Sequence, residues 1–269
     1  MIVAGCDVGS LTAKVVIMDE GKIISSSVIL SKANPVESAN EVMNTALTQA
    51  GLTMDDIHYS VGTGYGKEQI SFVKRMESEI SCHAKGAWWD TPSVRTVIDI
   101  GGQDAKAIRI DDTGKVIRYA YNDKCASGTG RFLEVMAGAL EVEIEEMGAI
   151  GKQAKEKVTI SNQCVIFAET EVISLINEGK EVSNIVNGLH HALANRVASL
   201  ARSIAVEPDV VMTGGVAKNN GMFDALAKGL NLPVKALDHV DPQINGAFGA
   251  ALFAEEFLQS ANNPVSSFK

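Results

Sequence analysis

Apolar runs that end in an aspartate and a glycine-containing turn occur twice along the chain. The first run leads into DVGSLTAK at 7–14, and the second leads into DIGGQDAK at 99–106. After each turn come another apolar stretch, an aspartate and a Gly-Lys pair, at 21–22 and at 114–115. Short apolar runs bounded by turn residues are typical of buried strands. The pattern therefore predicts two equivalent strand–turn–strand hairpins.

Helical periodicity fills much of the remaining sequence. In residues 183–204, apolar side chains recur every three or four positions, which places them on one face and predicts a core helix. Further predicted elements are helices near 36–50, 129–147, 167–176 and 246–258, and short strands near 58–61, 158–160 and 210–212.

The repeated hairpins indicate two related half-domains of an α/β fold. We expect the first to span residues 1–90 and the second to span 91–245. The amphipathic helix at 246–258 is expected to pack back onto the first half-domain. A chain of 269 residues, of which 46% are hydrophobic, is long enough for two cores of ordinary size.

The first turn carries groups that suit phosphate binding. Gly9 lets backbone N–H groups approach an anion, and the hydroxyls of Ser10 and Thr12 add donors. A carboxylate repels phosphate, so Asp7 and Asp99 are better interpreted as partners of Mg²⁺, through water. A single Asp-x-Gly sequence is most simply an ordinary hairpin turn. Two aligned copies favour a nucleotide held in a cleft by two phosphate-binding turns.

A third glycine turn follows the predicted strand at 210–212. Its residues are Thr213, Gly214, Gly215, Val216 and Ala217. Backbone without side chains lets a nucleobase and ribose lie close, although a Gly-Gly pair can equally serve close helix packing. Taken in order, the three turns resemble those of the actin, hexokinase and acetate kinase superfamily. That resemblance implies a duplicated ribonuclease H-like fold whose two halves close on ATP.

The charge balance and the absence of targeting patterns narrow the class of protein. Lys and Arg number 24 against 33 Asp and Glu, a net charge of −9, which argues against nucleic acid or an anionic membrane as the main partner. The sequence starts without a signal-peptide pattern, and no apolar run approaches the ~20 residues that span a bilayer. We expect a cytoplasmic protein.

Two of the four cysteines share an unusual setting. Cys125 and Cys164 each stand just before a predicted helix, where unpaired N–H groups and the helix dipole stabilise a thiolate. Cytosolic cysteines are more often small buried hydrophobic residues, and this pair lacks C-x-x-C spacing. A cubane iron–sulfur cluster takes four thiolates, so two chains sharing one cluster would supply the full set.

The surroundings of these cysteines carry a family resemblance. KCASGTGRF at 124–132 and CVIFAETEVIS at 164–174 closely resemble the two cysteine motifs of the activator ATPases of 2-hydroxyacyl-CoA dehydratases, in the BadF/BadG/BcrA/BcrD ATPase family. The second hairpin turn is similar as well. Further similar stretches are TGYG at 63–66, SCHA at 81–84, MTGGVA at 212–217 and GAFGAAL at 246–252.

The resemblance implies a homodimeric ATPase with one [4Fe-4S] cluster held by Cys125 and Cys164 of both chains. Such a protein takes an electron from ferredoxin or flavodoxin. It passes the electron, coupled to ATP hydrolysis, to a 2-hydroxyacyl-CoA dehydratase or a benzoyl-CoA reductase-type enzyme. The chain departs from the commonest family pattern at Leu11, where a threonine is expected, and at Asn162 and Gln163, where small hydroxyl residues are more usual.

We assign expected roles to the residues of the three turns. Gln103 is the candidate for orienting the attacking water, by analogy with a glutamine beside the γ-phosphate in other nucleotide hydrolases. Asp7, Asp99 and Asp104 compete for Mg²⁺ and for the role of general base. Lys106 is expected to be an ordinary exposed strand residue. The residues expected to bind ATP or ADP are Gly9, Ser10, Thr12 and Lys14 at the phosphates, Gly101, Gly102 and Gln103 opposite them, and Gly214, Gly215, Val216 and Ala217 at the nucleoside.

Other functions remain compatible with the fold. A small-molecule kinase, such as an N-acetylglucosamine-type sugar kinase, shares the three nucleotide turns. A kinase needs a carboxylate that faces its substrate but gains nothing from thiols at two helix starts. A non-enzymatic assembly protein that depends on a nucleotide is the third alternative, and it would lack sustained hydrolysis. The cysteine settings favour the activator.

Overall fold

A computed structural model of the chain describes residues 1–161 and 164–262, so the departures noted at Asn162 and Gln163 lie outside the described residues. The chain divides into two compact units, which are described separately. The first comprises Met1–Asp90 and Ile244–Lys269, and the second comprises Thr91–Gln243.

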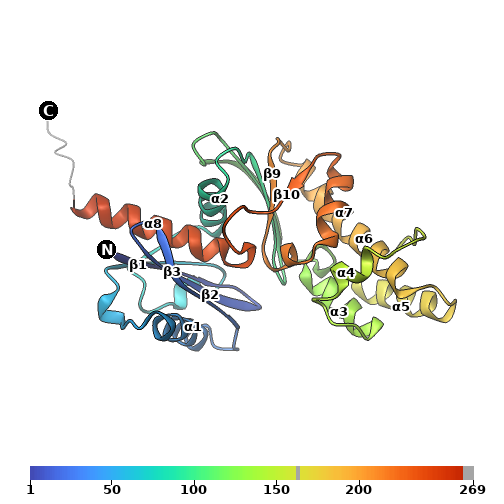
Figure 1. The fold of residues 1–269 in the computed structure, drawn as a ribbon, viewed down its shortest axis with the longest axis horizontal. Helices are drawn as coiled ribbons and strands as arrows, with labels where there is room; N and C mark the ends of the chain where they lie inside the picture. Colours follow the sequence, from blue (N-terminus) through green and yellow to red (C-terminus); the bar gives the residue numbers. More distant parts are fainter. Residues whose placement is uncertain (162–163, 263–269) are drawn as a thin grey trace. The chain divides into compact units, whose positions relative to one another are not determined.

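The first unit is built on a five-stranded mixed sheet with the order β3-β2-β1-β4-β5 (Figure 1). Helix α1 packs against the face of β1 that carries Ala4, Cys6 and Val8, whereas α8 meets the opposite face at Gly5. The strands are β1 (Ile2–Val8), β2 (Thr12–Asp19), β3 (Lys22–Leu30), β4 (Tyr59–Thr63) and β5 (Arg75–Met76), and the helices are α1 (Pro35–Ala50), α2 (Glu79–Asp90) and α8 (Asn245–Asn262).

The second unit repeats the arrangement with the sheet order β10-β9-β6-β7-β8. Its apolar core includes the predicted stripe of α6, in which Ile185, Leu189 and Leu193 are buried. The strands are β6 (Thr96–Ile100), β7 (Ala105–Ile110), β8 (Val116–Asn122), β9 (Val210–Thr213) and β10 (Val234–Lys235), and the helices are α3 (Gly130–Leu140), α4 (Met147–Gly151), α5 (Val165–Asn177), α6 (Val182–Arg202) and α7 (Gly221–Leu230). Short 3₁₀ turns occupy 54–56, 67–69, 126–128, 215–218 and 242–244.

The strand register confirms that the two hairpins are equivalent. In the first unit Asp7 lies opposite Lys14 on β2 and opposite Thr63 on β4. In the second unit Asp99 lies opposite Lys106 on β7 and opposite Thr213 on β9. Each aspartate therefore ends a central strand between an antiparallel lysine and a parallel threonine.

Two predicted elements differ from the structure. The helix predicted over 129–147 ends at Leu140, because Glu141 adopts a left-handed conformation with φ of 55° and its N–H caps the carbonyls of Ala137 and Gly138. The strand predicted over 158–160 is wrong. Val158 and Ile160 are buried in the core but form no strand pairing. A short apolar run indicates that a segment is buried, but it does not specify a neighbouring strand with which the segment would pair.

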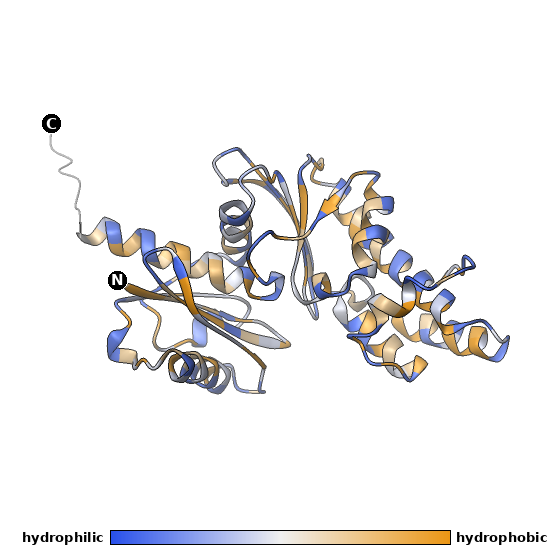
Figure 2. Cartoon of the chain, viewed as in Figure 1, coloured by the Kyte–Doolittle hydropathy of each residue, from blue (hydrophilic) through white to orange (hydrophobic). Residues whose placement is uncertain are grey.

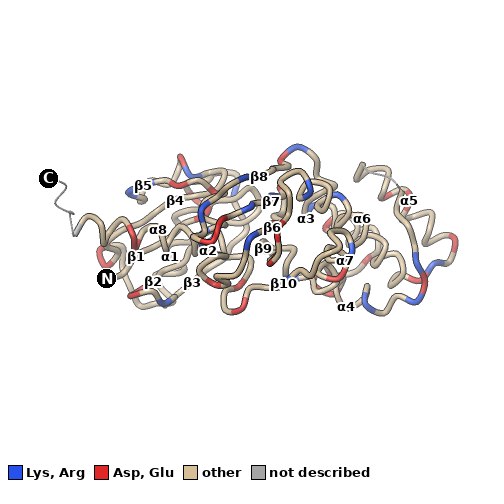
Figure 3. Tube along the Cα trace, turned by 90° about the horizontal axis from the view of Figure 1, so that it is seen from above, with Lys and Arg blue, Asp and Glu red and all other residues tan. Residues whose placement is uncertain are grey.

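Both kinds of charge are distributed along each unit, and Lys and Arg are interspersed with Asp and Glu (Figure 3). Among the helices of the described residues, none is both long and apolar enough to cross a bilayer.

Close packing of α8 on β1 depends on the absence of a side chain at Gly5. A Cβ placed there would lie 2.0 Å from the carbonyl oxygen of Ala247 and 2.3 Å from the nitrogen of Ala251. Both atoms belong to the helix backbone, which cannot give way as a flexible side chain can. The helix would therefore have to shift away from the strand.

We expect Gly5→Ala to lower the free energy of unfolding by about 2 kcal/mol or more, because overpacking a filled core typically costs ~1–3 kcal/mol. Urea denaturation followed by circular dichroism measures the change. The matched control is Gly138→Ala, since Gly138 is exposed on α3 and a Cβ there meets no atom within 4 Å. Equal midpoints for the two variants would contradict the packing argument.

Candidate functional site

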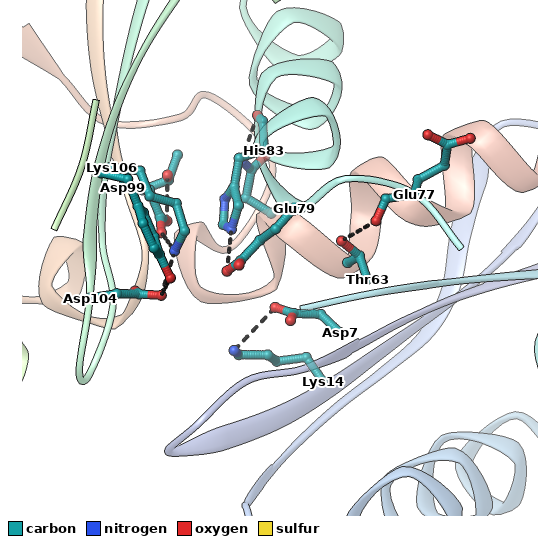
Figure 4. A network of polar contacts seen from close by, with 12 residues as sticks. Asp7, Lys14, Thr63, Glu77, Glu79, His83, Asp99, Asp104 and Lys106 are labelled. Carbon is teal, nitrogen blue, oxygen red and sulfur yellow. Dashed lines mark hydrogen bonds and ion pairs between the residues drawn. The ribbon is translucent and has the colours of Figure 1, made fainter. Parts of the chain in front are cut away.

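In the first unit, Asp7 lies at the end of β1 with one oxygen paired and one unpaired. Its Oδ2 is 3.1 Å from Lys14 Nζ, and the residue is 2% exposed (Figure 4). Oδ1 is buried, and no hydrogen bond from the described residues reaches it. A buried carboxylate oxygen without a partner is costly unless a cation or water satisfies it. Asp7 therefore fits the coordination shell of Mg²⁺, directly or through water.

The backbone of Gly64 lies directly against Asp7 Oδ1. It has a φ of +88°, and a Cβ there would lie 2.3 Å from Asp7 Oδ1. Any side chain at Gly64 would fill the space beside the carboxylate. At Gly64 the TGYG loop at 63–66 thus lies against this oxygen with backbone alone.

Glu79 and His83 are neighbours of Asp7 that the sequence pattern did not predict. Glu79 Oε1 lies 3.9 Å from His83 Nε2, and both residues come from the start of α2 (Figure 4). A Cβ on Gly246 would lie 3.0 Å from His83 Nε2 and 3.1 Å from Asp7 Oδ2, so the three side chains meet at one corner. His83 belongs to the SCHA motif, but Glu79 lies before that motif, and no sequence motif included it. Cys82, next to His83, is fully buried.

The equivalent carboxylate of the second unit is enclosed by protein partners. Asp99 Oδ2 lies 3.2 Å from Lys106 Nζ, and Oδ1 accepts a hydrogen bond from Thr213 Oγ1 at 2.9 Å. Asp104 Oδ2 lies 2.9 Å from the same lysine and accepts a hydrogen bond from Tyr121 at 3.2 Å. Because protein groups already satisfy both oxygens of Asp99, Asp7 is the better placed of the two for a cation.

The prediction that Lys106 is exposed is wrong, since the residue is 1% exposed. Strand β7 lies between β6 and β8, and its register directs Lys106 to the face of Asp99. Two carboxylates offset the cost of burying its ammonium group. The repeat itself carried the signal, because Lys14 pairs with Asp7 in the same way.

The two hairpin turns close in the same manner. The Gly9 N–H donates to the Thr12 carbonyl at 3.1 Å, and the Gly101 N–H donates to the Asp104 carbonyl at 2.9 Å. Ser10 and Gln103 stand exposed at the tips, where each can reach a ligand. These are the side chains expected to contact phosphate and the attacking water.

The second and third turns meet at the start of α3. Gly130 and Arg131 donate their N–H groups to the carbonyls of Gly101 and Gly102, each at 2.8 Å. A Cβ on Gly130 would lie 3.0 Å from Gly101 O and 3.2 Å from Val216 Cγ2. The first turn of this helix is therefore fixed directly to the hairpin turn.

The two glycines of the third turn differ in their surroundings. Gly214 has a φ of +87°, and a Cβ there would lie 2.4 Å from the Ile100 carbonyl, so close packing on β6 requires this glycine. Above Gly215 the nearest atom to a Cβ is Gln243 Nε2 at 3.8 Å, which leaves room for a ligand. Val216 and Ala217 are 7% and 5% exposed, and their side chains belong to the core.

The four cysteines fall into a buried pair and an exposed pair. Cys6 and Cys82 are buried, and burial raises the pKa of both thiols. Cys125 and Cys164 are exposed, at the positions just before the 3₁₀ turn 126–128 and helix α5. The interpretation of cysteines as small buried hydrophobic residues therefore holds only for the first pair.

Cys125 is held by hydrogen bonds from neighbouring side chains. Its Sγ lies 2.9 Å from the Ser127 hydroxyl, and hydrogen bonds from Ser127 lower the pKa of the thiol. The Asn122 side chain brackets the residue, accepting from its N–H at 3.2 Å and donating to its carbonyl at 2.9 Å. Within the described ranges, no group of three or more His, Cys, Asp or Glu residues forms a metal site.

Arg196 on α6 is a further residue that sequence analysis did not single out. Its Nη1 donates to the Ser127 carbonyl at 2.9 Å, and its guanidinium lies 5.3 Å from the centre of the Phe132 ring. The only signal in the sequence was a charged residue beside the apolar stripe of a core helix. Its contact with Ser127 depends on tertiary packing.

Comparison with known proteins agrees with these features. The model of the BadF/BadG/BcrA/BcrD ATPase family matches residues 4–254. The activator of lactoyl-CoA dehydratase from Anaerotignum propionicum is 46% identical over 96% of this chain and 99% of its own. One of the subunits of the benzoyl-CoA reductase from Thauera aromatica is 35% identical over 94% of this chain and 92% of its own.

Solved structures show the fold. The activator of the 2-hydroxyisocaproyl-CoA dehydratase from Clostridium difficile, with bound ADPNP, matches with a TM-score of 0.94 at 41% identity, over 100% of both chains. A ROK family glucokinase from Streptomyces griseus matches with a TM-score of 0.62 at 15% identity, over 95% of this chain and 100% of its own, which shows a common fold alone. The expected actin/hexokinase-like fold is confirmed.

We expect Lys106→Met to lower the free energy of unfolding by about 3–5 kcal/mol, because it leaves the carboxylate of Asp99 buried without its cation. Chemical denaturation at neutral pH measures the loss. Adding Asp99→Asn should recover part of it, since the amide oxygen can still accept from Thr213 without carrying charge. A double variant no more stable than the single variant would contradict this account.

Proposed function

The chain belongs to the BadF/BadG/BcrA/BcrD ATPase family, and on that basis we propose that it is the ATP-dependent electron-transfer activator of a 2-hydroxyacyl-CoA dehydratase. One observation carries the proposal. Of four cysteines, two are exposed at the starts of helical segments, in the unit that also holds two of the three glycine turns. A small-molecule kinase of this fold has no use for such thiols.

ATP binding and hydrolysis are assigned to the turns. Gly9, Ser10, Thr12 and Lys14 hold the β- and γ-phosphates, and the unpartnered oxygen of Asp7 holds hydrated Mg²⁺. Gly101, Gly102 and Gln103 face the γ-phosphate, and the amide of Gln103 orients water. The backbone of Gly214, Gly215, Val216 and Ala217 borders the nucleoside. Among Asp7, Asp99 and Asp104, the unpartnered oxygen favours Asp7 as the metal partner.

A [4Fe-4S] cluster fits the exposed thiols of two chains. Each chain offers Cys125 and Cys164, and a cubane cluster takes four thiolates. Hydrogen bonding by Ser127 favours the thiolate of Cys125, which is the form that binds iron. When bound, the cluster supplies one-electron chemistry. These residues of the chain hold and orient it.

We propose that α5 packs against a second copy of the chain. Ile166, Phe167, Ile173 and Ile176 on this helix are between 39% and 66% exposed, and the helix begins directly after Cys164 (Figure 2). It contains no Lys or Arg. Burying four large apolar side chains stabilises association, because each contributes about 1.5–3 kcal/mol when fully removed from water. A homodimer formed here brings the cysteines of both chains together.

The start of α3 supports coupling between nucleotide and thiols. The hairpin turn at Gly101 and Gly102 accepts hydrogen bonds from Gly130 and Arg131, and Cys125 lies just before the 3₁₀ turn that leads into this helix. A change in the hairpin turn on hydrolysis therefore reaches Cys125 through one short segment of backbone. The electron comes from ferredoxin or flavodoxin and goes to the dehydratase, or to a partner of the benzoyl-CoA reductase type.

Anaerobic purification tests the cluster assignment. We expect roughly four iron and four sulfide per two chains, with a visible charge-transfer spectrum. Cys125→Ala and Cys164→Ala should each lose the iron, because each removes two of the four thiolates from the dimer. The control Cys82→Ala should retain it, since that thiol is buried. A double variant of Cys125 and Cys164 that keeps its cluster, or an iron-free wild type after reconstitution, would refute the assignment.

Ile166→Glu tests the interface. The new carboxylate would be buried against the second chain, so we expect the dimer to dissociate to monomers in sedimentation velocity. Ile117→Glu is the matched control, because Ile117 is 50% exposed on β8 and lies outside the proposed interface. Dissociation of both variants, or of neither, would argue against α5 as the contact surface.

A further inference from the structure

Arg196 holds a positive charge near Cys125, to which it is linked through Ser127. It lies two-thirds of the way along α6 and is half-buried. Arg196 therefore places a cation beside the Cys125 side of the proposed cluster site.

The guanidinium is fixed in place. Nη1 donates a 2.9 Å hydrogen bond to the carbonyl of Ser127, whose hydroxyl lies 2.9 Å from Cys125 Sγ. Its other side rests on the Phe132 ring at 5.3 Å from the ring centre. A hydrogen bond and a cation–π contact together restrict the side chain more than either alone. The charge is therefore held at a constant place relative to the 3₁₀ turn that carries Cys125.

Other cations near Cys125 lie in a different environment. Lys124 is 87% exposed at its side chain and pairs with Asp123 at 3.2 Å, and Arg131 pairs with Glu134 at 3.0 Å. Exposed pairs of this kind are screened by water and salt. A charge that is half-buried acts through a lower effective dielectric, so its Coulomb effect on a neighbouring anion is larger.

We propose that Arg196 is a positioning residue for electron transfer, which fixes the turn of Cys125 and raises the reduction potential of the group held by Cys125 and Cys164. The inference rests on the proposed function. Reduction adds one electron, supplied by the one-electron donor protein, and so adds one negative charge beside the guanidinium. Coulomb attraction stabilises this more negative state, so the potential is higher with Arg196 than without it.

The test compares three variants of the anaerobically reconstituted protein. Arg196→Gln removes the charge, Arg196→Lys keeps it, and Lys235→Gln removes one charge from β10, at the sheet edge opposite β8. A mediated redox titration, followed by electron paramagnetic resonance of the reduced state, gives each midpoint potential. We expect a downward shift for Arg196→Gln relative to wild type and to Lys235→Gln, and recovery of most of the shift in Arg196→Lys.

Three results would overturn the inference while leaving the proposed function intact. They are a wild-type potential in Arg196→Gln, an equal shift in Lys235→Gln, and a shift in Arg196→Lys as large as that in Arg196→Gln. A wild type that assembles no cluster would instead refute the proposed function.

A second measurement applies if Arg196→Gln assembles no cluster. Iodoacetamide alkylation of the metal-free protein at pH 7, resolved by peptide mass spectrometry, compares the rates at Cys125 and Cys164. Loss of the hydrogen bond to the Ser127 carbonyl should release the turn that carries Cys125, so we expect the rate at Cys125 to change relative to the rate at Cys164, when compared with wild type and Arg196→Lys. Unchanged rates in a variant with a wild-type circular dichroism spectrum would overturn the inference.

Discussion

The pairing of an aspartate with a lysine across the first hairpin sets the geometry of each unit. Asp7 faces Lys14 and Asp99 faces Lys106 in the same antiparallel register, so each turn is held between a buried carboxylate and its cation. The surroundings then make the copies different. Thr213 and Lys106 satisfy both oxygens of Asp99, whereas one oxygen of Asp7 is left under Gly64. The first hairpin thus has an aspartate oxygen that lacks a protein partner and suits a cation. In the second hairpin, protein groups satisfy both oxygens of the aspartate.

The contacts of the second hairpin connect its turn to the segment that carries Cys125. With Asp99 and Asp104 both tied to Lys106, the turn at Gly101 and Gly102 has a fixed base. Its carbonyls accept the first N–H groups of α3, so the helix start follows any movement of the turn. Cys125 lies before this helix, at the start of the 3₁₀ turn 126–128. Arg196 on α6 donates a hydrogen bond to the carbonyl of Ser127 in the same turn. The turn at Gly101 and Gly102 and the charge near Cys125 are therefore linked through adjacent atoms.

Features encoded by local pattern could be predicted from the sequence, whereas features set by tertiary contacts could not. The two hairpins and the stripe of α6 follow from apolar periodicity, which needs no knowledge of partners. The burial of Lys106 depends on β8 covering β7, and the role of Arg196 depends on α6 meeting the turn of Ser127. The left-handed cap at Glu141 stopped a helix whose apolar pattern continued. The apolar run at 158–160 is buried, as its pattern indicates, but it forms no strand.

The four cysteines show why residue type alone does not decide chemistry. Burial raises the thiol pKa of Cys6 and Cys82, so neither supplies a thiolate at neutral pH. Ser127 lowers the pKa of Cys125, and the positive charge of Arg196 acts in the same direction. Solvent access therefore separates the two pairs of cysteines, and Ser127 and Arg196 act further on Cys125. Arg196 also holds the turn that follows Cys125 through the Ser127 carbonyl, while the Asn122 side chain holds the backbone of Cys125 itself.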